Sequence, residues 1–194
     1  GDLLTAQTGA VTINSATVNL DGSIRTSGVA QAVTITGGAG GIDLQAGDTI
    51  TTTSSTAGAD SGLIDINVNA GNVVINGNLI TTGSNNALGN GGDGGAISLT
   101  GTGNSQINVT GNFTTTGGTS TLLAGNGGNA GSITFETANK YIELNGSTLT
   151  AIAGIPGGNS VAGNGGNVVF NDEVNIGNAN AIITTGETTG NIVF

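Results

Sequence analysis

The chain has 194 residues, 38 of them glycine, and its two basic residues, Arg25 and Lys140, stand against twelve acidic ones, for a formal net charge of −10. So few cations argue against nucleic acid, whose phosphates are bound by lysine and arginine, and against an anionic membrane surface. Because 36% of the residues are hydrophobic and only 7% are charged, the composition favours a folded chain over a disordered one. No run of 18 apolar residues occurs, so no membrane insertion is expected.

Short triplets recur along the whole chain in a fixed order of three kinds. The first two kinds have the form apolar-x-apolar, and the third begins with an apolar residue and in most units ends in threonine. The first kind lies at 11–13, 33–35, 64–66, 97–99, 133–135, 168–170 and 192–194, the second at 18–20, 42–44, 73–75, 107–109, 142–144 and 174–176, and the third at 24–26, 50–52, 80–82, 113–115, 149–151 and 183–185. Alternation with a period of two predicts short strands with one buried face, and the β-branched residues in the triplets favour strands as well.

Three strands per unit, repeated in the same order, predict an all-β fold: a right-handed parallel β-helix with three sheets and about six to seven rungs. The first strands begin between 22 and 36 residues apart, and the extra residues fall at one place only, after the third strand. We therefore expect a single solenoid domain over residues 1–194, with surface loops at one corner, at 54–62, 83–95, 117–131 and 152–166.

A glycine-asparagine run precedes three of the first strands, as LGNGGDGGAISL at 88–99, AGNGGNAGSITF at 124–135 and AGNGGNVVF at 162–170. Glycine and asparagine tolerate positive φ, so the run predicts a tight corner that returns the chain to the stack. The residues Gly89, Gly91 and Gly94 match the dinucleotide-binding string, but that string acts between a strand and a helix, and here it leads into a strand. We expect no cofactor and no bound metal.

Catalysis in such a fold needs clustered carboxylates, or a carboxylate beside a basic residue. The chain has no histidine, and its outward acids on the second strands, Asp43 and Glu143, are three rungs apart. We expect the protein not to be an enzyme. Leu99 is predicted to point inward, into the core.

The third strands place threonine at the expected outward position in five rungs: Thr51, Thr81, Thr114, Thr150 and Thr184. This column is interpreted either as simple β-propensity or as a flat face that orders water, as in ice-binding solenoids. The neighbouring outward column is predicted as Ser27, Thr53, Gly83, Thr116, Ile152 and Gly186, so threonine is interrupted there.

The Gly-Asn-Gly-Gly corner before a strand, together with Ile75-Asn-Gly-Asn78 and Ile80-Thr-Thr-Gly83, resembles bacterial exoproteins of the filamentous-haemagglutinin type. The resemblance is strongest over 63–190. It implies a right-handed parallel β-helix, two-partner-secretion-like export to the cell surface, and a role in adhesion or surface matrix.

These observations together predict a structural shaft of a secreted bacterial adhesin or cell-surface fibre. The alternatives are a filament subunit that stacks end to end, a carbohydrate-binding or polysaccharide-acting β-helix, and an ice-binding solenoid. Residues 3–5 copy the third-strand pattern and residues 192–194 the first-strand pattern, with no protective cap at either end. The expected partners are therefore like chains or neighbouring solenoid segments, with host or environmental glycans as further candidates.

Overall fold

The computed structural model describes residues 2–177, 182–185 and 189–194, and in this part of the chain every regular element is a β-strand. One sheet has seven strands and holds the predicted third strands. In spatial order these are β1 (Asp2–Ala6), β3 (Gly22–Thr26), β5 (Thr49–Thr53), β8 (Asn78–Thr82), β11 (Phe113–Thr116), β14 (Thr148–Ile152) and β17 (Ile182–Thr185). Each strand pairs in parallel with the next, as a solenoid requires.

The predicted first and second strands belong to one eleven-stranded sheet rather than to two separate sheets. In the first two rungs they are continuous, as β2 (Val11–Leu20) and β4 (Val33–Leu44). They are separate strands in later rungs: β6 (Ile64–Asn69) and β7 (Val73–Ile75), β9 (Ile97–Thr102) and β10 (Ile107–Val109), β12 (Ile133–Thr137) and β13 (Ile142–Leu144), β15 (Val168–Phe170) and β16 (Val174–Ile176), with β18 (Ile192–Val193) last.

Residues with positive φ bend the chain at the corner between the first and second strands, and in β4, which is a continuous strand, the residue is Gly41 with a φ of 81°. Ala70, Gly103 and Asn139 adopt positive φ of 64°, 69° and 65° and bend the chain between the two strands of their rungs. In β4 the glycine-rich stretch 37–41 crosses the same corner in strand pairing with β2, where the register shifts between Ser15 and Thr17. The predicted three-sided coil is therefore present, although two of its sides share one sheet.

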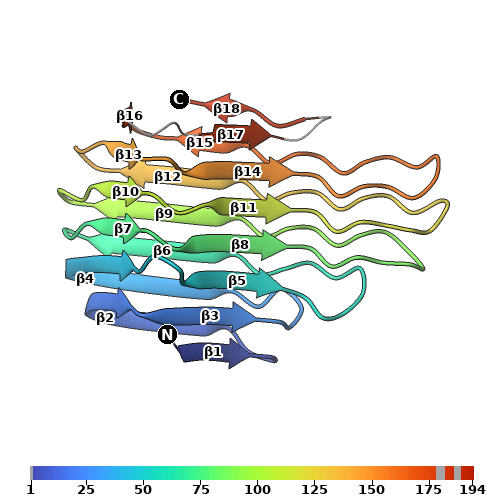
Figure 1. Ribbon diagram of the computed structural model, residues 1–194, viewed down its shortest axis with the longest axis horizontal. Helices are drawn as coiled ribbons and strands as arrows, with labels where there is room; N and C mark the ends of the chain where they lie inside the picture. The colour runs from blue at the N-terminus through green and yellow to red at the C-terminus, as the bar shows by residue number, and fades with distance from the viewer. Residues whose placement is uncertain (1, 178–181, 186–188) are drawn as a thin grey trace.

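The coil is right-handed, as predicted. In Figure 1 the stack rises from the N-terminus to the C-terminus, β5, β8 and β11 run rightward on the near side, and β6 and β9 return leftward on the far side. Five turns, from the start of β2 to the start of β15, are described without a gap. Residues 178–181 and 186–188, which include Gly186 of the predicted second outward column, lie outside the described residues.

Inward residues stack in columns along the axis and form one continuous core. Val33, Ile64, Ile97, Ile133 and Val168 follow one another through paired strands, and all are fully buried. A column of phenylalanine rings runs beside them, with centroids 5.6 Å apart for Phe113 and Phe135, 5.2 Å for Phe135 and Phe170, and 5.3 Å for Phe170 and Phe194. Leu99 is fully buried, so its predicted inward orientation is confirmed.

The corners show why asparagine is frequent. The side-chain oxygen of Asn78 accepts the backbone N–H of Asn112 at 3.0 Å, and that of Asn112 accepts the backbone N–H of Thr148 at 2.9 Å. Asn72 does the same for Gln106 at 3.1 Å. At these corners the side-chain oxygen of an asparagine accepts the backbone N–H of the next rung. It takes the place of the backbone carbonyl that accepts this N–H within paired strands.

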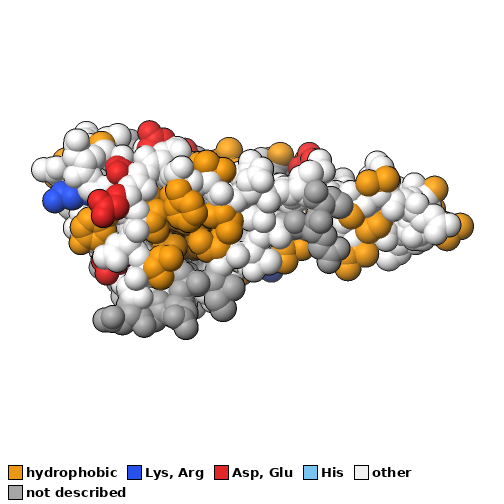
Figure 2. Space-filling view, turned by 90° about the horizontal axis from the view of Figure 1, so that it is seen from above, with side chains coloured by type: hydrophobic (Ala, Val, Ile, Leu, Met, Phe, Trp, Pro, Cys, Tyr) orange, Lys and Arg blue, Asp and Glu red, His pale blue; other side chains and the backbone are white. Residues whose placement is uncertain are grey.

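The long segments after the third strands leave the stack at one corner, as predicted. They form an ordered extension that we call the wing (residues 54–63, 83–96, 117–132 and 153–167). Figure 1 shows them on the right, each lying over the one before. Figure 2, which looks along the stack, shows the wing as a narrow arm on the broader body. Each segment goes out and returns, so two arms of backbone lie side by side.

Glycine allows these two arms to touch. The N–H of Gly118 donates to the carbonyl of Gly92 at 2.7 Å, that of Gly128 to Gly118 at 2.9 Å, and that of Gly154 to Gly128 at 2.8 Å. These bonds alternate between outgoing and returning arms as they climb the stack. A Cβ on Gly128 would lie only 1.9 Å from the carbonyl oxygen of Gly92, so no larger residue fits there.

The third copy of the glycine-asparagine run is displaced relative to the other two. Asn129 donates its N–H to the side chain of Asp93, and Asn164 donates its N–H to the side chain of Asn129. Aligning the sequences of the runs would make Asn167 equivalent to Asn129. In the structure Asn164 is the residue that follows Asn129 in the stack. The run is a returning segment in all three rungs, but its repeated letters do not mark equivalent positions in the last one.

Candidate functional site

The outer face of the seven-stranded sheet carries the threonines singled out in the sequence, and the strand register decides which of them lie together. Thr114 pairs with Thr150 on one side and with Ile80 on the other, while Thr150 pairs with Thr184. Thr51 also pairs with Ile80. Thr51, Thr114 and Thr150 are half-buried and Thr184 is exposed, as expected for outward side chains.

Thr81 does not belong to this column, so its predicted outward position is wrong. Leu79, not Ile80, pairs with Ile50 and Phe113 and is fully buried, which turns Thr81 into the core. Leu79 and Ile80 are adjacent apolar residues, and the alternating pattern fits either register. The same ambiguity affects β1, where Leu3 and Leu4 are adjacent apolar residues. β1 is a strand as predicted, but its register is shifted by one residue, so that Leu4 rather than Leu3 lies opposite Ile24.

The inward threonines of the third strands have a hydrogen-bonding role that the sequence analysis missed. The hydroxyls of Thr52, Thr81 and Thr115 donate to the carbonyl oxygens of Gly62, Gly95 and Gly131, each at 2.5 Å, and Thr26 donates to Gln31 at 2.8 Å. Every acceptor lies two residues before the next first strand. These hydroxyls satisfy carbonyls where the chain enters the next first strand, so they link the end of one strand to the start of another. Their spacing from Ile24, Ile50, Leu79 and Phe113 could have revealed them.

The corrected register also changes the second outward column. Thr82 pairs with Thr53 and with Thr116, so three threonines follow one another before Ile152. Gly83, which the sequence placed in this column, begins a wing segment instead, and Gly186 lies outside the described residues. Thr51, Thr53, Thr82, Thr114, Thr116 and Thr150 therefore form one continuous surface, which we call the threonine face.

The charge on this face is confined to one end. On the outward positions of β3, β5, β8, β11 and β14, Arg25 is the charged residue, and it precedes Thr51 at the N-terminal side. The neighbouring outward positions are Ser23, Thr49, Asn78, Asn112 and Thr148, all polar and uncharged. The face therefore presents hydroxyls, amides and methyl groups.

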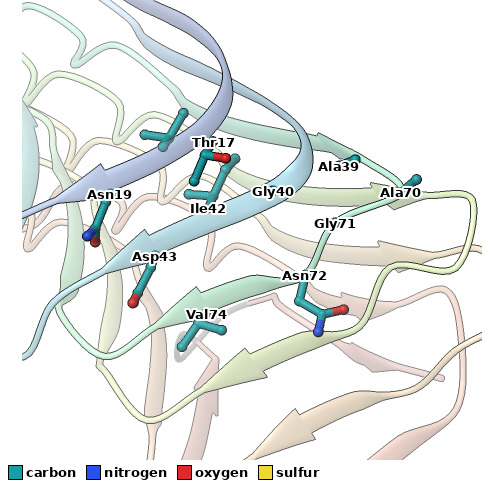
Figure 3. Close-up of a pocket in the computed structure, with 11 residues that line it drawn as sticks. Thr17, Asn19, Ala39, Gly40, Ile42, Asp43, Ala70, Gly71, Asn72 and Val74 are labelled. Carbon is teal, nitrogen blue, oxygen red and sulfur yellow. The ribbon is translucent and has the colours of Figure 1, made fainter.

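An open pocket of about 470 Å³ lies at the corner crossed by β2, β4 and β7 (Figure 3). Asn19 and Asp43 project from adjacent strands, with Val74 on the next. Gln45 Nε2 donates to Asp43 Oδ2 at 2.8 Å and to Asn19 Oδ1 at 3.2 Å, while Asp43 Oδ1 is buried and has no hydrogen-bond partner. The labelled side chains in Figure 3 spread over the surface and do not converge on one point.

The structure does not bring the two outward acids together. Glu143 lies on β13, and β10 and β7 separate it from Asp43 on β4. Its carboxylate accepts hydrogen bonds from Gln106 Nε2 at 3.1 Å and Asn145 Nδ2 at 2.9 Å. The hydroxyl of Thr137, with help from the backbone N–H of Glu173, lowers the pKa of Asp172, which lies in a turn. In the described ranges, no three residues of the histidine, cysteine, aspartate or glutamate kind are grouped to hold a metal ion.

Comparison with protein families, characterised proteins and solved structures gave no match to this chain. Among the described residues, no helix of sufficient length and apolarity to span a membrane is present.

Proposed function

We propose that the chain is a structural segment of a secreted bacterial adhesin or surface fibre, and that it has no catalytic role. The observation that carries this proposal is the unbroken stacking of each rung on the next. Core columns, corner asparagines and wing glycines all repeat along the same axis. When every part of a rung contacts the next rung, the stack resists bending and can be extended by further rungs.

The two edge strands of the stack carry exposed apolar residues. On β1, Leu3 and Leu4 are 63% and 52% exposed. At the other end Ile192, Val193 and Phe194 are exposed, and Figure 2 shows hydrophobic side chains gathered over this end of the stack. Open parallel edges with apolar side chains favour pairing with further strands. The partner we propose is a neighbouring solenoid segment, supplied by the same chain or by a like chain.

The resemblance of the corner motifs to filamentous-haemagglutinin-type exoproteins supports the proposed location outside the cell. In that setting a charge-poor, cysteine-free solenoid serves as a spacer, and adhesive surfaces are displayed along it. The wing, which projects from the body over four rungs, is the part of the surface best placed for contact with other molecules (Figure 1).

Immunogold electron microscopy of intact producing cells tests this proposal. Antibodies raised against the purified chain, selected for binding to the wing, are applied without permeabilisation, and cells lacking the gene are the control. We expect gold particles on the cell surface, arranged along thin filaments. Label that appears only after the cells are broken open would contradict the proposal.

A further inference from the structure

We propose that the threonine face binds ice. This inference is independent of the shaft role, because it concerns only the outer surface of β5, β8, β11 and β14. It depends on the observed register, which joins Thr53, Thr82 and Thr116 into a second column beside Thr51, Thr114 and Thr150.

The first argument is geometric. Outward residues two apart in a strand are about 6.6 Å apart, and paired strands are about 4.8 Å apart. Thr51 and Thr53 are such a pair along β5, and Thr114 and Thr116 are another along β11. Over β5, β8, β11 and β14 the two columns have eight positions, of which six are threonine and two, Ile80 and Ile152, are isoleucine. The hydroxyls therefore lie on a rectangular array that repeats in two directions. Oxygen atoms on surfaces of hexagonal ice repeat at two lengths close to these, so the array matches a crystalline layer of water.

The second argument concerns the chemistry of the face. Each threonine offers a hydroxyl that anchors one water and a methyl group around which water forms a cage. Ile80, which lies between Thr51 and Thr114 in the first column, adds apolar surface there. Charged groups hold strongly oriented hydration shells that do not fit an ice lattice, and here the charge is confined to Arg25 at the edge. We therefore expect this uncharged face, with its hydroxyl and methyl groups, to bind ordered water in preference to a dissolved solute.

The third argument is rigidity. β-Branched side chains such as threonine have few χ1 rotamers, so holding their hydroxyls in an array costs little entropy. The backbone beneath is fixed by pairing on both sides of β5, β8 and β11, and the inward hydroxyls of Thr52, Thr81 and Thr115 tie the same strands to the wing. The positions of the outward hydroxyls are thus fixed before the face binds ice.

A flat crystalline polysaccharide is the other extended lattice that a sheet could bind. Such surfaces are bound through aromatic rings that lie flat on the sugar. The chain has no tryptophan, and its one tyrosine, Tyr141, lies between β12 and β13, away from the threonine face. Water ice is therefore the ligand that this face favours.

The test measures inhibition of ice recrystallisation and retention of fluorescently labelled protein on a growing ice crystal. The unchanged chain is compared with Thr114→Tyr and Thr116→Tyr, whose rings would break the array at its centre. The matched control is Thr134→Tyr, because Thr134 is also a half-buried outward threonine but lies on the other sheet, in β12. Thermal melting establishes that each variant is folded.

We expect the unchanged chain and Thr134→Tyr to bind ice and slow recrystallisation to the same degree, and both face variants to lose these activities while keeping their melting temperatures. Absence of ice binding by the unchanged chain would overturn the proposal, as would equal activity in all four proteins. Retention on microcrystalline cellulose without retention on ice would assign the face to a polysaccharide instead. None of these results depends on where the chain is found in cells, so the shaft proposal is tested separately.

Discussion

At the scale of single residues, the same residue type has different roles on the two sides of a strand. Thr114 points outward, whereas Thr115 points inward, where its hydroxyl satisfies the carbonyl of Gly131. Asparagine shows a similar division. Asn139 uses positive φ, as the sequence analysis expected of this residue type, but Asn78 and Asn112 accept hydrogen bonds from the rung above. Composition alone cannot distinguish these roles, because they depend on which side of the backbone faces the core.

The core leaves little room for a charge, which gives a prediction at this scale. Leu99 lies between Ile66 and Phe135 in paired strands and is fully buried. Leu99→Asp would place a carboxylate there with no partner, so we expect it to lower the free energy of unfolding by about 3–5 kcal/mol. Chemical denaturation measures this loss.

The control for this variant is Thr134→Asp, which adds the same charge at an outward position of β12. We expect it to change the free energy of unfolding by less than about 1 kcal/mol. If Leu99→Asp were as stable as this control, the inward column at Leu99 would be wrongly assigned.

At the scale of elements, the three kinds of strand and their order were predictable because apolar alternation is set by burial and repeats with each rung. The register of β8 was not, since Leu79 and Ile80 are both apolar and only pairing with β5 and β11 decides between them. The order within the wing was not predictable either. Part of its order comes from contacts between backbones, such as Gly118 with Gly92, and the trace of these contacts in the sequence is glycine, which is equally typical of loops. Thr51, Thr114, Thr150 and Thr184 lie outward as predicted. The wrong position of Thr81 put Gly83 in the second column in the place of Thr82.

The close approach of the two arms predicts that the wing does not tolerate a Cβ at its centre. Gly128→Ala would force the methyl group into the carbonyl of Gly92, which is backbone and cannot turn aside. We expect a loss of at least about 2 kcal/mol in stability and faster proteolysis within 117–132, because overpacking displaces the backbone. Limited proteolysis followed by mass spectrometry locates the cleavage.

Gly9→Ala serves as the matched change, because a Cβ there meets no atom within 4 Å. It should leave both stability and the cleavage pattern as they are. Equal proteolysis of the two variants would mean that the wing arms are not in contact in solution.

At the scale of the whole molecule, the chain is a short stack with a long lateral arm, and its body and its wing repeat along one axis (Figure 1). The stack gains its order from pairing between successive rungs rather than from a closed globular core, so further rungs extend it without a change of design. This is the physical basis for the proposal that the chain is part of a fibre, and the proposal predicts the direction of the strands relative to the fibre axis.

Diffraction from aligned filaments tests the central claim most directly. Filaments are isolated from the surface of producing cells and identified with antibodies against this chain. If the solenoid axis runs along the filament, the strands lie across it, and a reflection at about 4.8 Å must appear along the filament axis. A reflection of that spacing found only at right angles to the axis, or none at all, would contradict the proposed shaft.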